Sequence, residues 1–501
     1  MTGPAPTPAL ARLRAQVAHL APRETPEVRV LRHRGTCGDA VGADEIALHL
    51  DVAVVDAACD GACWAAPAAT VVRPGHRHRF ARLDRAVPDE IAACVRGECD
   101  EPQAGSGEHG LTARLGRNDG TLADVLAQGG YAAYALAATL PPARIIEVLK
   151  TVGLTGRGGA HFPVAMKWGL VAAHEDAATV GAKVLVVNAE EGEPGVFKDR
   201  HLLEGDPHRL IEGILIACHT TGVREVVVYI NGQARAARAA FERALADARA
   251  AGIVDGSALG GGAVAIEVRS GAGGYVCGAE SVILNSIEGE RPVPRFKPPF
   301  ATDSGLFGRP TLINNAETLC AVTTIFDTPP PPTKLVPLSG DVFRPGLYEV
   351  PVDGSMTWAG VLAMAGVAPA RVQALLLGGP SGRFVLPQEF DAPLEMRALG
   401  AGGTVVLGPN ADIAHVTREL AAYNARESCG ECTPCREGTQ RLVQLMADPA
   451  ANRAQIDALI EVMTEASLCA LGSMAGRPVT SALDAFPDAF EIAEVSERSA
   501  R

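Results

Sequence analysis

The chain has 501 residues, a formal net charge of −13 and 47 % hydrophobic residues. This length predicts several domains with packed cores, and the acidic balance argues against binding to nucleic acid, whose phosphates require lysine and arginine. No apolar run reaches the ~18 residues of a membrane span, and the first residues lack the pattern of a secretory signal. We therefore expect a cytoplasmic protein, in which twelve cysteines are better explained as metal ligands or buried thiols than as disulfides.

The first hundred residues alternate between strand and helix patterns. The expected elements are a strand at Glu27–His33, a helix at Gly38–Leu50, a strand at Val52–Ala58 and a hairpin over Ala69–Arg73 and Arg77–Leu83. A strand–helix–strand unit followed by a hairpin predicts a thioredoxin-like domain over residues 1–100. The polar stretch after it, to about Gly110, predicts a solvated linker.

The next block, residues 111–327, contains most of the glycine-rich segments. Lys183–Val187 and Glu225–Ile230 are β-branched runs of the buried-strand type, and a helical pattern at Pro207–Cys218 lies between them. Buried strands joined by a helix predict a parallel α/β domain.

Three features follow towards the C-terminus. Pro329–Pro332 predicts a short stiff spacer. Residues 334–408 have the pattern of a small strand-rich domain, and residues 411–490 that of a helical domain. The whole chain is therefore expected to be a multidomain α/β protein.

The strongest chemical signal is the C-x2-C-x2-C spacing of Cys429, Cys432 and Cys435. This spacing brings three thiolates to one metal centre, and the helix pattern that follows would direct its positive end towards the cluster. Cys469 is the one cysteine further along the chain, and we expect it to be the fourth ligand. Two alternatives remain at this point, a single zinc ion and a set of ordinary buried thiols.

Three glycine-rich or acidic segments are weaker signals. They are Gly153–Pro163, Asn188–Gly195 directly after an expected strand, and Gly271–Glu280. Glycines allow backbone N–H groups to approach a phosphate or a flat ring, and ligands of α/β sheets bind past the carboxyl ends of strands. Taken alone, the first segment is better explained as an ordinary tight turn, and the second is equally well explained as a solvated acidic turn. Cys277 in the third segment has no spaced partner and is explained by packing.

Together, these segments resemble the NADH-binding flavoprotein subunit of respiratory complex I, which also occurs in soluble NAD-dependent formate dehydrogenases and NAD-reducing hydrogenases. The resemblance spans roughly residues 140–490. It rests on GLTGRGGAHFP, NAEEGEPGVFKDR, GAGGYVCGAE, RPVPRFKPPF, GRPTLINNAETL and SCGECTPCREG, in that order. It implies three cofactors, FMN, NAD and one [4Fe–4S] cluster.

The resemblance also implies site residues and domains. It assigns to the FMN site Gly156, Arg157, Gly158, Lys167, Asn188, Glu190, Glu191, Tyr275, Gly278, Asn314 and Asn315. It assigns to the nicotinamide nucleotide Phe162, Glu193, Glu280, Lys297 and Phe300, and to the cluster Cys429, Cys432, Cys435 and Cys469. It further implies a β-grasp (ubiquitin-like) fold for residues 334–408 and a cluster-holding helical bundle for residues 411–490.

This sequence departs from the family pattern at several positions. His161 stands where the family usually has glycine, and Ala279 replaces the first of two usual glutamates. Glu190 replaces a usual aspartate and Gly192 a usual serine. The change at Ala279 leaves Glu280 as the remaining carboxylate of that pair.

The N-terminal region resembles the [2Fe–2S] partner subunit of these complexes. That fold usually supplies four cysteines, and here Cys37, Cys59 and Cys63 are present while Gly42 takes the place of the remaining ligand. We therefore expect a docking domain without a cluster, with Cys94 and Cys99 as free thiols.

The resemblance implies a diaphorase subunit that transfers electrons between NAD(H) and a [4Fe–4S] cluster through FMN. The fused N-terminal domain and the total length favour the β subunit of NAD-dependent formate dehydrogenase. Its expected partners are a formate-oxidising molybdenum-type subunit and a small [2Fe–2S] subunit. An NAD-reducing hydrogenase and complex I are the alternatives within the family, and a clusterless docking scaffold is the alternative from another class.

Overall fold

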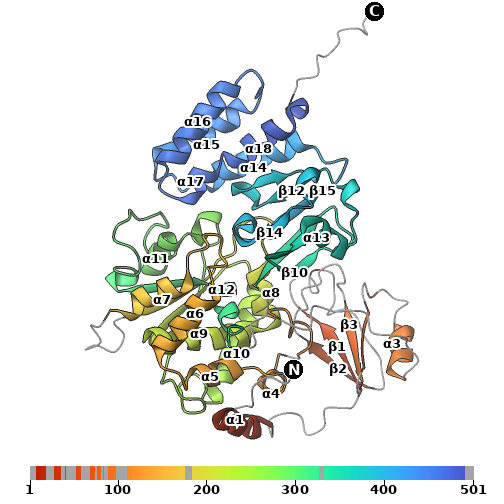
Figure 1. The fold of residues 1–501 in the computed structure, drawn as a ribbon, viewed down its shortest axis with the longest axis vertical. Coiled ribbons are helices and arrows are strands. Elements are labelled where there is room, and N and C mark those ends of the chain that lie inside the picture. Colours follow the sequence, from red (N-terminus) through yellow and green to blue (C-terminus); the bar gives the residue numbers. More distant parts are fainter. Residues whose placement is uncertain are drawn as a thin grey trace, which may run out of the picture.

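A computed structural model describes residues 7–18, 28–34, 40, 52–57, 68–73, 76–80, 83, 88–96, 110–118, 120–174, 183–326 and 332–490. In Figure 1 the C-terminal helices lie at the top, and a mixed sheet lies beneath them on the right. A domain built on a parallel sheet lies at the lower left, and a small N-terminal sheet at the lower right. The multidomain α/β class expected from the sequence is therefore confirmed, whereas the domain boundaries stay predictions.

The N-terminal sheet has four strands in the order β2-β1-β3-β4. They are β1 (Arg29–His33), β2 (Ala53–Ala57), β3 (Ala69–Arg73) and β4 (His76–Phe80). β1 pairs parallel with β2 and antiparallel with β3, and β3 and β4 form a hairpin. Helix α3 (Pro88–Val95) packs on β3, where Ile91 is fully buried. The four predicted strands are confirmed, and the order fits the expected thioredoxin-like fold.

Several expectations for this region lie outside the described residues. They concern the helix at Gly38–Leu50 apart from residue 40, the linker before Gly110, and the positions Cys37, Gly42, Cys59, Cys63 and Cys99. The expectation that Cys94 is a free thiol is wrong, because Cys94 is disulfide-bonded. Spacing along the chain does not show which thiols meet in space.

Helix α1 (Pro8–Ala18) belongs to a different core from the strands that follow it. Leu10, Leu13 and Val17 are at most 4 % exposed and share a hydrophobic core with the parallel-sheet domain. There α1 packs against α4 (Leu122–Ala127) and α5 (Ala132–Ala137). The first helix therefore stabilises the parallel-sheet domain.

The parallel sheet has the order β7-β6-β5-β8, and all its strand pairs are parallel, as expected for a parallel α/β domain. Its strands are β5 (Val184–Ala189), β6 (Glu225–Ile230), β7 (Ala265–Ser270) and β8 (Thr311–Asn315). One face packs on α6 (Pro142–Val152), α7 (Val164–Ala172), α9 (Pro207–Thr221), α10 (Arg235–Ala250) and α12 (Ala316–Val322). The other face packs on α11 (Glu280–Glu288), because successive side chains of a strand point to opposite faces. Helix α8 (Lys198–Gly205) follows the acidic segment after β5.

The mixed sheet has five strands in the order β10-β9-β15-β12-β13. They are β9 (Thr333–Gly340), β10 (Gly346–Pro351), β12 (Ala374–Leu377), β13 (Arg383–Val385) and β15 (Thr404–Leu407). Its first and last strands, β9 and β15, pair parallel at the centre, and α13 (Trp358–Met364) packs in the core below. The short pair β11 (Asp353–Thr357) and β14 (Pro393–Glu395) completes a strand-rich domain. This topology supports the β-grasp prediction.

The C-terminal domain consists of α14 (Ile413–Glu427), α15 (Thr433–Leu445), α16 (Arg453–Ala466), α17 (Ala470–Met474) and α18 (Arg477–Ala485). Helix residues such as Ile413 and Val479 share one core with Leu376 and Phe384 of the mixed sheet, so the helices are packed firmly on that sheet. The loop from α14 to α15 carries Cys429 and Cys432. In the described segments, no helix combines the length and apolar character needed to cross a membrane.

Candidate functional site

A cavity of about 1060 Å3 lies where the parallel-sheet domain, the mixed sheet and the C-terminal helices meet. Its lining comes from the glycine-rich loop, the segments that follow β5 and β8, residues 275–281, residues 397–401 and residues 467–477. Every residue predicted for the nucleotide site lines this cavity except Arg157 and Phe300. Arg157 is buried behind the wall, and Phe300 is 54 % exposed outside it.

The glycine-rich loop is held closely against the sheet. The Gly156 amide donates to the carbonyl oxygen of Phe162 at 2.9 Å, and the Arg157 amide donates to Thr318 Oγ1 at 2.8 Å. A Cβ added at Gly158 would lie 3.2 Å from Cβ of Asn315, so a side chain there would require the loop or Asn315 to shift by a few tenths of an ångström. The loop therefore offers a backbone surface to a flat or phosphorylated ligand.

Two glutamates on the cavity wall have unsatisfied carboxyl oxygens. Burial raises the pKa of Glu190 and of Glu193 to about 7 in each case. Asn231 Nδ2 donates to Glu190 Oε1 at 2.6 Å, but Glu190 Oε2 and Glu193 Oε1 are buried without a partner among the described residues. A ligand with N–H or O–H donors would satisfy both.

Glu280 is in a different electrostatic state. Lys167 Nζ lies 2.5 Å from its Oε1, and Lys297 Nζ lies 3.5 Å from its Oε2. Burial works to raise the pKa of Glu280, but the two lysines outweigh it and lower the pKa below the usual value. Glu280 is therefore ionised and neutralised locally, whereas Glu193 forms no ion pair with a described residue, although Lys198 and Lys334 lower its pKa from a distance.

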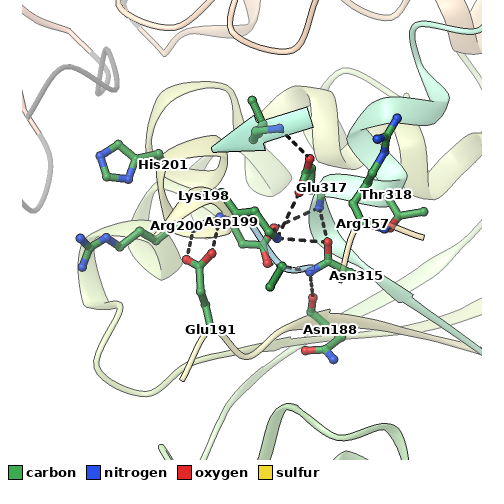
Figure 2. A network of polar contacts seen from close by, with 12 residues as sticks. Arg157, Asn188, Glu191, Lys198, Asp199, Arg200, His201, Asn315, Glu317 and Thr318 are labelled. Atoms are coloured by element: carbon green, nitrogen blue, oxygen red, sulfur yellow. Dashed lines mark hydrogen bonds and ion pairs between the residues drawn. The ribbon is translucent and has the colours of Figure 1, made fainter. Parts of the chain in front are cut away.

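Behind the cavity lies a buried polar network that joins two domains (Figure 2). Lys334 Nζ of β9 lies 2.5 Å from Glu317 Oε2, and Lys198 Nζ lies 3.3 Å from the same oxygen. Lys198 also pairs with Asp199 at 2.8 Å, and Asn315 Nδ2 donates to Asp199 Oδ2 at 2.6 Å. The network thus fixes Asn315, a cavity residue, to the start of α8 and to the mixed sheet.

Glu191 belongs to the same region of Figure 2 but has a separate role. Its carboxylate accepts hydrogen bonds from the Asp199 amide at 2.8 Å and the Arg200 amide at 3.1 Å. These amides lie in the first turn of α8, where amides lack partners within the helix. Glu191 therefore anchors that helix end beside the cavity.

Sequence reasoning missed four members of this network, Lys198, Asp199, Glu317 and Lys334. Lys198 and Asp199 line the cavity and lie inside the segment NAEEGEPGVFKDR. Their position in a segment already assigned to the nucleotide site was the signal that could have identified them. Lys334 is fully buried. Lys334 begins the apolar run KLVPL, which is typical of a buried strand. A lysine buried in a strand requires a carboxylate nearby, and this requirement was the available signal.

The four predicted cluster cysteines converge at the edge of the cavity. Burial raises the pKa of Cys435 to about 11, and the nearby charges of Cys432, Cys469 and Cys429 act in the same direction. All four are free thiols, and Cys469 lines the cavity. Within the described residues, no three His, Cys, Asp or Glu side chains are arranged to hold a single metal ion.

Three contacts hold the nucleotide wall against α14 and against the mixed-sheet domain. The Tyr275 amide donates to Glu427 Oε2 at 2.8 Å, and the Tyr275 hydroxyl donates to Ser381 Oγ at 2.9 Å. Tyr423 of α14 donates to the carbonyl oxygen of Gly192 at 3.2 Å. The segment that carries Cys429 and Cys432 is therefore packed directly against the nucleotide wall.

The residues present fit a flavin nucleotide beside an iron–sulfur cluster. The cavity has the volume of a cofactor site, a glycine-rich backbone wall and several buried polar atoms without partners. The thiols adjoin its far wall through Cys469.

Comparisons with known proteins agree with this fit. Residues 149–324 match the Nuo51 FMN-binding domain, and residues 415–493 match the iron–sulfur binding region of NADH-ubiquinone oxidoreductase F. The chain is 35 % identical over 389 residues to an NADH-quinone oxidoreductase subunit of Mycobacterium bovis, covering 72 % of this chain and 87 % of that one. It is 37 % identical over 400 residues to an NADH-quinone oxidoreductase subunit of Rhizobium meliloti, covering 74 % and 94 %.

A solved structure extends the likeness along nearly the whole chain. A chain of the NAD+-reducing [NiFe]-hydrogenase in the H2-reduced state aligns with a TM-score of 0.68 at 28 % identity. The alignment covers 96 % of this chain and 89 % of that one. The expected cofactors, FMN, NAD and a [4Fe–4S] cluster, are confirmed by the two matched domains and these relatives. The chain belongs to the family of NADH-binding flavin and iron–sulfur subunits that occurs in NADH-quinone oxidoreductases.

Proposed function

We propose that this chain is the diaphorase subunit of a cytoplasmic NAD-dependent formate dehydrogenase. Its partners would be a formate-oxidising molybdenum-type subunit and a small [2Fe–2S] subunit. One observation carries the diaphorase role: a single cavity is lined both by the nucleotide segments and by Cys469. A clusterless scaffold would have no need for four thiols converging on that wall.

The residues of the cavity orient two nucleotides rather than supply acid–base chemistry. When bound, FMN exchanges a hydride with the nicotinamide and single electrons with the cluster. Phe162, 41 % exposed, offers a ring face at the cavity mouth, and Lys167 Nζ lies 5.8 Å from its centroid. Stacking on this ring would orient the nicotinamide relative to the flavin. The rate of hydride transfer would then depend on this orientation rather than on an acid or base.

A second candidate is the diaphorase subunit of an NAD-reducing hydrogenase. The likeness to the hydrogenase chain covers 96 % of this chain, so it includes most of the N-terminal region as well. The fused N-terminal domain is therefore compatible with both complexes. Purification of the native complex and assay of NAD+ reduction with formate and with H2 decides between them: formate-dependent reduction supports the first proposal, and H2-dependent reduction alone refutes it.

We predict that NADH is preferred over NADPH and that the preference increases with pH. Burial raises the pKa of Glu193 to about 7, and its Oε1 has no partner among the described residues. Glu193 therefore ionises as the pH rises from 6 to 8 and then repels a 2′-phosphate. Steady-state kcat/KM values for both nucleotides at pH 6 and pH 8 measure this. Glu193→Gln should lower the preference at pH 8 by about tenfold and remove its pH dependence.

The family alone does not settle this preference, since a relative 33 % identical over 395 residues is the NADP-reducing hydrogenase subunit HndC of Solidesulfovibrio fructosivorans. Glu280→Gln is the matched control. Its charge is already balanced by two lysines, so its effect on discrimination should be smaller than that of Glu193→Gln. Equal kcat/KM values for the two nucleotides in the unchanged protein would refute the prediction.

We also predict that the N-terminal domain carries no cluster and docks a neighbouring subunit. A variant that lacks residues 28–100 but keeps α1 should retain FMN and NADH oxidation with artificial acceptors, because Leu10, Leu13 and Val17 remain in their core. It should lose co-purification of partner subunits. Iron analysis provides the check: a loss of two irons per chain on deletion would show that the domain holds a [2Fe–2S] centre.

A further inference from the structure

His161 lies in the cavity wall, in the glycine-rich loop and close to residues 397–401 of the mixed-sheet domain. Its φ is 51°, in the left-handed region that non-glycine residues avoid. Glycine, the usual family residue here, would adopt this conformation without strain. A strained side chain at a cofactor cavity suggests that the side chain itself has a use.

The imidazole of His161 has no partner for either ring nitrogen. Both Nδ1 and Nε2 are buried, and neither forms a hydrogen bond with any described residue. Nε of Arg157, on the same loop, is also buried without a partner. Buried polar atoms in native proteins normally form hydrogen bonds, so these nitrogens are candidates for contact with a ligand.

The surroundings of His161 are cationic. Burial lowers its pKa, and the positive charges of Lys334, Arg157 and Arg397 lower it further, so the ring is neutral at pH 7 and has one N–H donor. The neighbouring carboxylate, Glu317, acts in the opposite direction, but it is paired with Lys334 and Lys198. The positive charges that remain without an ion pair among the described residues here are Arg157 and Arg397. An electropositive wall with unused donors is suited to an anion.

We propose that His161 donates a hydrogen bond to the terminal phosphate of FMN and is a specificity residue for the phosphorylated flavin. The phosphate is the one strongly anionic group of FMN. Arg397 lines the cavity on the same side as His161, whereas Glu190 and Glu193 line it as carboxyl groups without an ion pair among the described residues. The proposal rests on the FMN assignment. The pyrophosphate of NADH is the other possible source of the same chemistry.

The test uses the full-length chain after removal of flavin, titrated with FMN and with riboflavin, which lacks the phosphate. Quenching of flavin fluorescence reports the affinity. His161→Gly should weaken FMN binding about tenfold, the size of one hydrogen bond to a charged group, and leave riboflavin binding unchanged. His161→Asn keeps a donor and tolerates the left-handed region, so it should retain more FMN affinity than His161→Gly.

A thermal midpoint of the flavin-free protein separates this role from a structural one. The midpoint should not fall in His161→Gly, because glycine removes the backbone strain. Equal weakening of FMN and riboflavin, or no change in either, would overturn the proposal. A change confined to NADH affinity would overturn it in favour of the pyrophosphate. Failure of the unchanged protein to bind FMN would instead count against the proposed function.

Discussion

Replacing Cys432 by alanine is expected to remove the whole [4Fe–4S] cluster while most of the FMN stays bound. Cys432 is the N-cap residue of α15, and its thiol is one of four that converge beside the cavity. Three thiolates do not complete the four-cysteine set. The flavin residues lie on other elements, around β5 and β8. Iron, sulfide and flavin analysis of the purified variant measures both outcomes.

Cys218→Ala is the matched control for this prediction. Cys218 is a fully buried free thiol in α9, outside the cluster, so its replacement should leave the iron content unchanged. Retention of four irons in Cys432→Ala would show that the cluster assignment is wrong. Loss of both iron and flavin would show instead that FMN binding depends on the presence of the cluster.

Glu317→Gln is expected to cause the largest loss of stability among single substitutions in the buried network. Glu317 and Lys334 are fully buried, and Glu317 is the carboxylate that pairs with Lys334. Removing one partner of a buried ion pair leaves an uncompensated charge and costs about 3–5 kcal/mol. The denaturation midpoint of the transition that includes the parallel-sheet domain is the measurement, since a chain with several domains need not unfold in one step.

Two further variants test the cause. Glu431→Gln removes an exposed pair with Arg291 at 3.4 Å and should cost less than about 1 kcal/mol. The double variant Glu317→Leu with Lys334→Met removes both charges and should recover much of the loss. An equal loss of stability in Glu317→Gln and Glu431→Gln would show that the buried ion pair contributes no more to stability than the exposed one.

The same carboxylate gives a pH dependence with a definite sign. Burial works to raise the pKa of Glu317, but Lys334, Lys198 and Arg157 outweigh it and lower the pKa. The folded pKa is then below the unfolded one, so the stabilisation is complete above the unfolded pKa and is lost as the pH falls through the folded pKa. Glu317→Gln should lack this part of the acid sensitivity.

The sequence predicted elements whose pattern is local and missed partnerships made across domains. The run at Lys183–Val187 became β5, and the helical pattern at Pro207–Cys218 became α9, which ends at Thr221. In both cases burial on a sheet imposes a regular apolar pattern. The edge strand β7 shows a mostly exposed pattern and has no such signature.

In the site too, local sequence patterns were predicted and contacts between distant segments were missed. A short spacing predicted three of the cluster cysteines, Cys469 was chosen as the one cysteine further along the chain, and the nucleotide residues came from the family resemblance. No spacing relates Lys334 to Glu317, or α1 to the core of the parallel-sheet domain, because those contacts form only when separate segments pack. The orphaned ring of His161 likewise becomes visible only when the surrounding side chains are in place.

Anaerobic titration of the purified chain with NADH tests the electron path most directly. Absorption follows the flavin, and electron paramagnetic resonance follows the cluster. We predict that NADH bleaches the flavin band and that electrons then reach a [4Fe–4S] centre in the unchanged protein, whereas Cys432→Ala shows flavin reduction alone. A chain whose flavin is reduced by NADH but whose intact cluster stays oxidised, although a strong chemical reductant reduces it, would contradict the proposed path from the cavity to Cys469.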